Sequence, residues 1–215
     1  MKIGVLGTGD VGRTLGKGLA AVGHDVKMGS RDAKNEKLKA WVSETGSKGS
    51  GGTFAEAAAF GEVILLATLW DGTENAIKQA NPKNFANKVV LDATNPLVFK
   101  PDSPPALALG HTDSGGEQVQ RWLPNARVVK VFNTVGNAHM VNPSFPGGPP
   151  DMFIGGNDEG AKKVATDICK ALGWPGTIDL GGIEASRLLE PMCIVWVLYG
   201  IRGGGWNHAF KMLRK

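Results

Sequence analysis

Cysteine and long apolar runs are scarce in this 215-residue chain. Cys169 and Cys193 are its only cysteines, and they fit neither a C-x-x-C motif nor a metal-ligand spacing. We therefore expect two buried, reduced thiols and no metal site. The longest apolar stretch, residues 192–199, is too short to cross a bilayer. The first expected strand begins at Met1 and leaves no room for a signal peptide, so we expect a cytoplasmic protein that binds no membrane.

Strong charge and catalytic tyrosine motifs are also missing. The formal net charge is +4, with 20% charged and 42% hydrophobic residues, as in an ordinary globular protein. The basic residues are scattered and form no stripe interleaved with aromatic residues, so nucleic acid is not an expected partner. Tyr199 is the only tyrosine, and no Tyr-x-x-x-Lys pair exists, which argues against a short-chain dehydrogenase mechanism.

The first residues carry the clearest motif. Residues 1–6 (MKIGVL) are typical of a buried parallel strand, and Gly7, Gly9 and Gly12 then match G-x-G-x-x-G at the start of an expected helix. The first glycine allows a tight turn, and the second lets the backbone approach a pyrophosphate. The third allows close packing of the helix on the strand. This order of strand, glycine loop and helix predicts a dinucleotide-binding unit.

The end of the second expected strand indicates which dinucleotide binds. An NAD site usually has a carboxylate there, about twenty residues beyond the glycines, to bind the ribose hydroxyls. This chain has Ser30 and Arg31, with Lys34 close by. A hydroxyl and a guanidinium suit phosphate oxygens, so NADP(H) is the predicted cofactor. The alternative is a solvated basic loop in which Asp32 binds the ribose.

The remaining pattern alternates between strands and helices and predicts an α/β fold, a Rossmann-type doubly wound parallel sheet with a small helical C-terminal region. Expected strands are 1–6, 24–29, 62–68, 88–93, 126–132, 151–154 and 177–180, with 46–52 a loop or a poor edge strand. Expected helices are 10–22, 35–45, 53–61 with a Thr53/Glu56 capping box, 72–80, 118–123, 159–172, 185–199 and 206–213. We predict an NADP-binding domain over 1–156 and an acceptor-side or dimerisation region over 157–215. Residues 98–116 form an unusually long loop, as lids often do.

A few side chains are candidates for a role near the nicotinamide. His139 follows a strand end and is the best-placed histidine, but a polar loop position explains it better than acid catalysis. Trp70, Phe132 and Trp206 could wall a pocket for a planar acceptor, or simply pack. Arg187 and Glu190 lie three residues apart on one expected helix, where they could pair.

Several blocks, in this order, resemble a known family. They are GTGDVGRTLGKGLAAVGHDVKMGSRDA, LLATLW, DATNPL, VVKVFNTVGNAHMVNP, MFIGGNDEGAKKV and DLGGIEASRLLEPM. Together they resemble the NADP-dependent oxidoreductases of the deazaflavin coenzyme (F420) type, over almost the whole chain.

The resemblance assigns cofactor-binding roles to residues at the expected strand ends. It implies that Thr8, Gly9, Asp10 and Val11, beside Gly7, hold the pyrophosphate, and that Ser30, Arg31 and Lys34 hold the adenosine phosphate. It implies that Ala67, Thr68, Leu69 and Trp70 flank the ribose and nicotinamide, and that Asn95, Pro96 and Ala138 border the nicotinamide ring.

The resemblance also implies the reaction, a hydride transfer between NADP(H) and a deazaflavin (F420) or flavin-like small-molecule acceptor. Two cofactor rings can exchange a hydride without a protein acid, so no residue is assigned a catalytic role. Two alternatives stay open: an NADPH-dependent reductase of a small imine or carbonyl compound, and a non-catalytic NADP(H)-binding redox sensor. A pocket open to one side also favours a homodimer.

Overall fold

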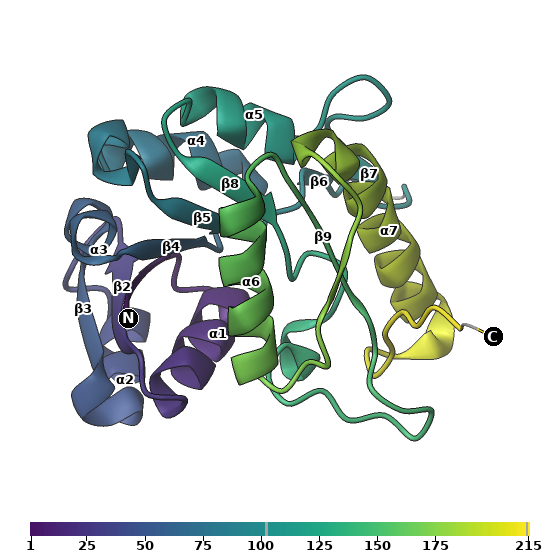
Figure 1. Ribbon diagram of the computed structural model, residues 1–215, viewed down its shortest axis with the longest axis horizontal. Coiled ribbons are helices and arrows are strands. Elements are labelled where there is room, and N and C mark those ends of the chain that lie inside the picture. The colour runs from purple at the N-terminus through teal and green to yellow at the C-terminus, as the bar shows by residue number, and fades with distance from the viewer. Residues whose placement is uncertain (102, 214) are drawn as a thin grey trace.

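The protein is built around one large twisted sheet with helices on both faces (Figure 1). The computed structural model describes residues 1–101, 103–213 and 215. Within these residues the main sheet has eight strands in the order β10-β9-β8-β5-β4-β1-β2-β3. All neighbouring pairs are parallel except β8 and β9. The segment β3-β2-β1-β4-β5-β8 has the 3-2-1-4-5-6 order of a Rossmann fold, which confirms the predicted fold class.

The strands follow the apolar segments of the sequence closely. They are β1 (Lys2–Leu6), β2 (Asp25–Ser30), β3 (Gly49–Thr53), β4 (Val63–Leu66), β5 (Val89–Asp92), β8 (Arg127–Lys130), β9 (Met152–Gly156) and β10 (Thr177–Asp179), with β6 (Leu97–Val98) and β7 (Ala106–Leu107) in a separate antiparallel pair. The glycine-rich segment 46–52 therefore contributes an edge strand.

Helices cover the two faces of the sheet and define two apolar cores. They are α1 (Asp10–Ala21), α2 (Glu36–Thr45), α3 (Phe54–Phe60), α4 (Trp70–Gln79), α5 (Gly115–Trp122), α6 (Glu159–Ala171) and α7 (Ser186–Tyr199). Side chains of α1, α2 and α6 pack on one face, and those of α3, α4 and α5 on the other. Successive residues of β1 divide between the faces: Ile3 and Val5 join the first core and Leu6 the second.

Local signals explain several of these boundaries. Thr53 Oγ1 accepts the backbone N–H of Glu56 at 3.2 Å, and Glu56 Oε2 accepts that of Thr53 at 2.6 Å, which is the predicted capping box. Asn35 caps α2 and Asp158 caps α6 more simply. Each side chain accepts one backbone N–H from the first turn of its helix. These caps fix where each helix leaves its preceding strand or turn.

The structure differs from the sequence prediction mainly near the C-terminus. Residues 206–213 are not helical, so that prediction is wrong. They form a tail without regular secondary structure that is bonded to residues 149–151. The N–H of Asp151 donates to Phe210 O at 3.0 Å, and Lys211 Nζ donates to Pro149 O at 2.6 Å. The α4 and α5 helices begin two and three residues before their predicted starts, at Trp70 and Gly115.

Other predicted boundaries have a mixed status. The long segment 98–116 includes the last residue of β6, all of β7 and the start of α5. Its residue 102 lies outside the described residues, and a lid role stays a prediction. The predicted boundary between two domains at residues 156 and 157 also stays a prediction. Strand β10, which belongs to the main sheet, lies on the C-terminal side of that boundary.

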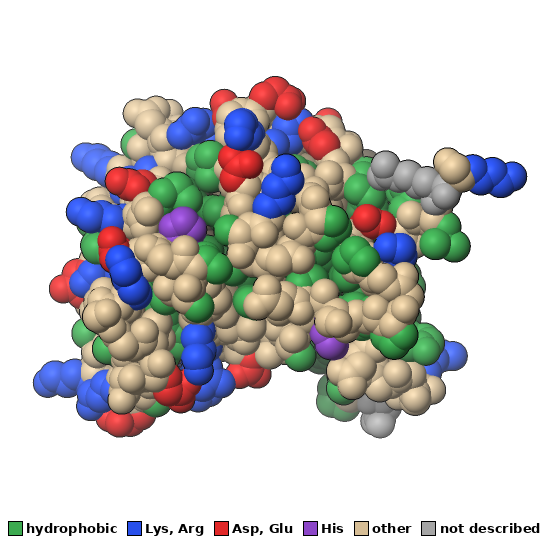
Figure 2. Space-filling view, turned by 60° about the horizontal axis from the view of Figure 1, so that its bottom comes forward, with side chains coloured by type: hydrophobic (Ala, Val, Ile, Leu, Met, Phe, Trp, Pro, Cys, Tyr) green, Lys and Arg blue, Asp and Glu red, His purple; other side chains and the backbone are tan. Residues whose placement is uncertain are grey.

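The outer surface combines mixed charge with an apolar face on α7. On the side shown in Figure 2, Lys and Arg side chains are interspersed with Asp and Glu. Leu188, Val195 and Tyr199 of α7 are each more than half exposed, and a homodimer using this face stays a prediction. Over the described ranges, no helix combines the length and the apolar character needed to cross a membrane.

Candidate functional site

The glycine loop after β1 has the geometry of a phosphate cradle. A Cβ on Gly7, whose φ is +126°, would lie 2.3 Å from Ala67 O, and one on Gly12 would lie 2.2 Å from Gly7 O. Gly9 is different, because its φ is −74° and a Cβ there would meet no atom of the described chain within 4 Å. The fold needs Gly7 and Gly12, whereas the space over Gly9 is free to receive a ligand at the N-terminus of α1.

A carboxylate stands at the entrance of this cradle. Asp10 is the first residue of α1 and is exposed. Arg13, one turn later, donates from a terminal guanidinium nitrogen to Asp10 Oδ1 at 2.6 Å. The ion pair offsets the negative charge that Asp10 would otherwise present to a polyphosphate.

The second strand ends beside the glycine loop, since the Gly7 N–H donates to Gly29 O at 3.2 Å. Ser30 is buried, and its Oγ accepts the N–H of Asp32 at 3.3 Å. Asp32 Oδ1 in turn accepts the N–H of Lys34 at 2.8 Å, so this carboxylate already serves the turn. Arg31 and Lys34 are exposed on that turn, as a phosphate-binding role requires.

The end of β4 lies against the same glycine loop. The Ala67 N–H donates to Leu6 O at 2.9 Å, and Leu69 is 88% exposed. Thr68 Oγ1 shares a 2.8 Å hydrogen bond with Thr73 Oγ1, which fixes the turn into α4. The indole of Trp70 stacks on Trp122 of α5, with centroids 5.6 Å apart. Residues 67–69 therefore face the edge with the glycine loop, and the Trp70 ring is committed to packing on α5.

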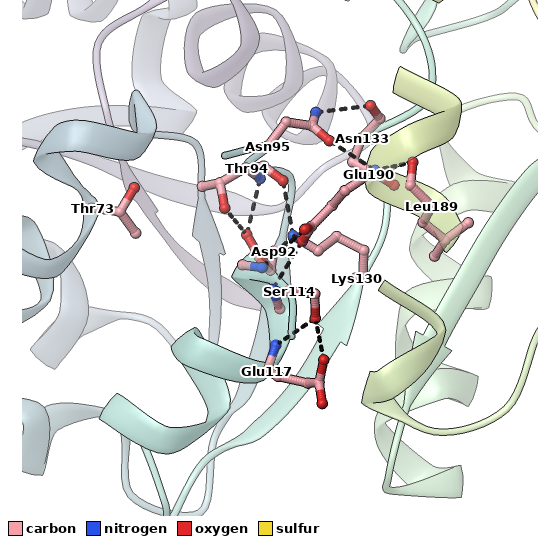
Figure 3. Close-up of polar contacts among 12 residues, drawn as sticks. Thr73, Asp92, Thr94, Asn95, Ser114, Glu117, Lys130, Asn133, Leu189 and Glu190 are labelled. Atoms are coloured by element: carbon pink, nitrogen blue, oxygen red, sulfur yellow. Dashed lines mark hydrogen bonds and ion pairs between the residues drawn. The ribbon is translucent and has the colours of Figure 1, made fainter. Parts of the chain in front are cut away.

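The ends of β5 and β8 are joined by two asparagines (Figure 3). Asn95 Nδ2 donates to Asn133 O at 2.9 Å, and Asn133 Nδ2 donates to Asn95 Oδ1 at 3.0 Å and to Leu189 O at 3.0 Å. Pro96 is buried behind this link, while Ala138 is exposed in a short 3-10 turn, Asn137–His139. The structure thus places the predicted cofactor residues of the first four segments at or next to the carboxyl ends of β1, β2, β4 and β5, whereas Ala138 lies in the 3-10 turn beyond the end of β8. Their contacts with a cofactor stay predictions.

The aromatic candidates have other roles. Phe132 is 1% exposed and lies in the core, so it cannot wall a pocket. Trp206 packs on Trp196, with ring centroids 5.3 Å apart. His139 Nε2 is 3.2 Å from Asn207 Oδ1, and its ring lies against Phe145, as expected of a polar loop residue.

The predicted Arg187–Glu190 pair is also wrong. Arg187 instead makes an ion pair with Glu117 of α5, because its side chain points away from the core. Glu190 points inward and is 1% exposed. There it pairs with Lys130, which also pairs with Asp92, and both of these residues are fully buried.

Sequence reasoning missed this buried charged cluster. Each of its two strands, VVLD and RVVK, has two or three apolar residues followed by a charged residue at its carboxyl end. Burial opposes the charge of Lys130, but Asp92 and Glu190 outweigh it and hold the pKa of Lys130 above its ordinary value. The sequence did offer one signal, a lysine at the end of a buried strand. Lysine is almost never fully buried unless it is paired, so Lys130 implied an acidic partner nearby.

The cysteines contribute no chemistry to this edge. Cys169 and Cys193 are both buried and free, as expected. Burial raises the pKa of each thiol to about 12, so both stay protonated and unreactive. The described residues contain no group of three or more His, Cys, Asp and Glu side chains arranged to hold a metal ion.

Comparison with known proteins identifies the family. Residues 2–96 match the family model described as NADP oxidoreductase, coenzyme F420-dependent. The chain is 32% identical to the F420-dependent NADP reductase of Methanocaldococcus jannaschii over 88% of each protein. The chain belongs to the coenzyme F420-dependent NADP oxidoreductase family. The predicted resemblance and enzyme class, an oxidoreductase, are thereby confirmed.

Further relatives extend the family match to the full length. The F420-dependent NADP reductase of Methanothermobacter marburgensis is 30% identical over 99% of this chain and 98% of its own. The crystal structure of a candidate F420-dependent NADP reductase from Arthrobacter sp. FB24 superposes with a TM-score of 0.92 and 38% identity over all of both chains. A reductive aminase from Aspergillus terreus, at 17% identity and a TM-score of 0.65 over 94% of this chain and 63% of its own, shares the fold alone.

Proposed function

We propose that this member of the family transfers a hydride between NADP(H) and the deazaflavin coenzyme F420. The observation that carries the proposal is the open space over Gly9, framed by Gly7 and Gly12, which the fold itself does not fill. The choice of F420 as the hydride acceptor follows from the relatives. Two of them are F420-dependent NADP reductases that match most or all of this chain.

The chain's own residues would divide the binding of NADP(H) among the segments that follow β1, β2, β4, β5 and β8. The loop Gly7–Val11 would hold the pyrophosphate with backbone N–H groups at the start of α1. Ser30, Arg31 and Lys34 would bind the 2′-phosphate through a hydroxyl and two cationic groups. Residues 67–70 and the segments around Asn95–Pro96 and Ala138 would hold the ribose and the nicotinamide ring.

The chemistry of this reaction makes few demands on the protein. When bound, the nicotinamide and deazaflavin rings supply a donor and an acceptor carbon for a hydride. The protein has to align the rings at roughly 3–3.5 Å and exclude water. His139, the best-placed histidine, already interacts with Asn207, which agrees with a site that uses no protein acid.

An acceptor panel tests the proposal directly. NADPH oxidation would be followed by absorbance with F420, FMN, FAD, a ferric chelate, a cyclic imine and a small ketone, each at equal concentration. We expect F420 to be reduced fastest. Turnover restricted to the imine or the ketone would overturn the proposal in favour of a small-molecule reductase. Tight NADPH binding without turnover on any acceptor would instead support a redox sensor.

A further inference from the structure

A buried ion cluster lies under the segment that follows β5 (Figure 3). The ammonium of Lys130 is 2.7 Å from Asp92 Oδ2, 2.9 Å from Glu190 Oε1 and 2.8 Å from Thr94 O. An ammonium has three N–H donors. Here Thr94 O accepts a hydrogen bond from it, and the two carboxylates form ion pairs with it. Lys130 is fully buried among these oxygens, so it is not placed to act on a substrate itself.

Both carboxylates also accept hydrogen bonds from the chain around them. Asp92 Oδ1 accepts both the backbone N–H and the hydroxyl of Thr94, at 2.9 and 2.7 Å. Glu190 accepts the N–H groups of Gly115 and Gly116, each at 2.9 Å. The cluster thus joins the ends of β5 and β8 to the start of α5 and to the middle of α7.

The connections converge on the backbone of Thr94. Its N–H, its hydroxyl and its carbonyl are each bonded to Asp92 or Lys130. The next residue, Asn95, is bonded to Asn133 in both directions. Immediately before Asn133, Phe132 has a φ of +64°, a left-handed conformation that a bulky residue rarely adopts. Such strained geometry persists where the surroundings over-determine it, and it gathers at functional sites.

Stability alone does not explain this arrangement. Well-packed apolar residues commonly stabilise a core as well as a buried ion pair does. The cluster also lies at the carboxyl edge of the sheet, where ligands of such folds bind. Its effect is to fix one short segment rather than to strengthen the middle of the core.

We propose that Lys130, with Asp92 and Glu190, is a positioning residue that holds Thr94–Pro96 in the geometry that receives the nicotinamide end of NADP(H). The inference rests on the proposed function, since it requires NADP(H) to bind along this edge. It makes a specific demand: disturbing the cluster should affect the nicotinamide half of the ligand and spare the adenosine half.

The test compares two ligands on the intact chain. NADP+ spans both halves, whereas 2′,5′-ADP carries only the adenosine and phosphate half. Dissociation constants would be measured by calorimetry for the wild type, Lys130→Met and Thr94→Val. We expect NADP+ affinity to fall about tenfold or more in Lys130→Met, with 2′,5′-ADP affinity unchanged. Thr94→Val, which keeps the ion cluster, should show a smaller loss with the same selectivity.

The possible results lead to different conclusions. Equal losses for both ligands, or no loss for either, in a folded variant would overturn the positioning role. If Lys130→Met does not fold, Thr94→Val alone decides between these outcomes by the same comparison. Failure of the wild type to bind either ligand would overturn the proposed function itself. Partial recovery of NADP+ affinity in Lys130→Arg, which restores a buried cation, would support the proposal further.

Discussion

Asn95 and Asn133 hold each other by reciprocal hydrogen bonds of 2.9 and 3.0 Å, one to a backbone carbonyl and one between the side-chain amides. The Asn95 side chain therefore serves as a strut between the ends of β5 and β8. Its remaining amide N–H and oxygen lone pair are the side-chain groups of Asn95 that could still contact a nicotinamide ring.

Replacing Gly9 with alanine should separate folding from binding. The backbone at Gly9 has φ −74°, and an added Cβ meets open space within the described chain, so the melting temperature should stay near that of the wild type. NADP+ binding should fall at least about tenfold, because the methyl group occupies the cradle for the pyrophosphate. Thermal melts and NADP+ titration of the same sample check both parts.

Gly12→Ala is the matched control for this experiment. Its Cβ would lie 2.2 Å from Gly7 O, so the helix would have to move away from the loop and stability should fall. A stable Gly9→Ala protein that binds NADP+ normally would contradict the assignment of the cradle.

Arg31→Ala should change the choice between dinucleotides. Charge-assisted bonds to phosphate contribute about 1.5–3 kcal/mol, so NADPH affinity should fall roughly 10- to 150-fold. NADH has no 2′-phosphate, and its affinity should barely change. Lys39→Ala is a suitable control, because Lys39 is also exposed but is paired with Glu36 at 2.7 Å. Equal losses for NADPH and NADH would show that Arg31 is not a phosphate ligand.

Lys130→Met should also reveal the cost of an uncompensated buried charge. Removing one partner of a buried ion pair costs about 3–5 kcal/mol of the free energy of unfolding. The pKa of Lys130 lies above its ordinary value of 10.5. Its contribution is therefore complete below pH 10.5 and is lost as the pH rises through the elevated value. Denaturant melts at neutral and strongly alkaline pH should show the difference from wild type shrinking only at the alkaline end.

The Glu117–Arg187 ion pair should act at the opposite end of the pH scale. The hydrogen bond from Arg187 lowers the pKa of Glu117 below its ordinary value of 4.5. Its stabilisation is therefore present above pH 4.5 and is lost as the pH falls through the lowered value. Glu117→Gln should be less stable than the wild type at neutral pH and should approach it in strong acid. A difference that stays constant over this range would show that the pair does not contribute through charge.

The regular part of the fold could be predicted because each local signal agreed with the packing. The strand Lys2–Leu6, the glycine loop and the capping box of Thr53 and Glu56 depend only on neighbours in sequence. The tail could not be predicted. Residues Trp206–Leu213 have a helix-like composition, but their backbone bonds to residues 149–151, which is a long-range choice.

The candidate site was predictable in part for the same reason. Strand ends can be read from the sequence, so residues such as Gly9 and Arg31 could be placed on the correct edge of the sheet. Side-chain partners across the fold could not. Arg187 and Glu190 fit a local pair by spacing, yet they bind Glu117 and Lys130, more than fifty residues away.

The cluster of Asp92, Lys130 and Glu190 also constrains how this family can diverge. An apolar substitution of Lys130 leaves the buried side chains of Asp92 and Glu190 without their shared cation, and only a coordinated change of these partners removes that cost. These positions should therefore vary together among relatives. A relative with an apolar residue in place of Lys130 must have lost the carboxylates as well, and would need a different way to hold the segment after β5.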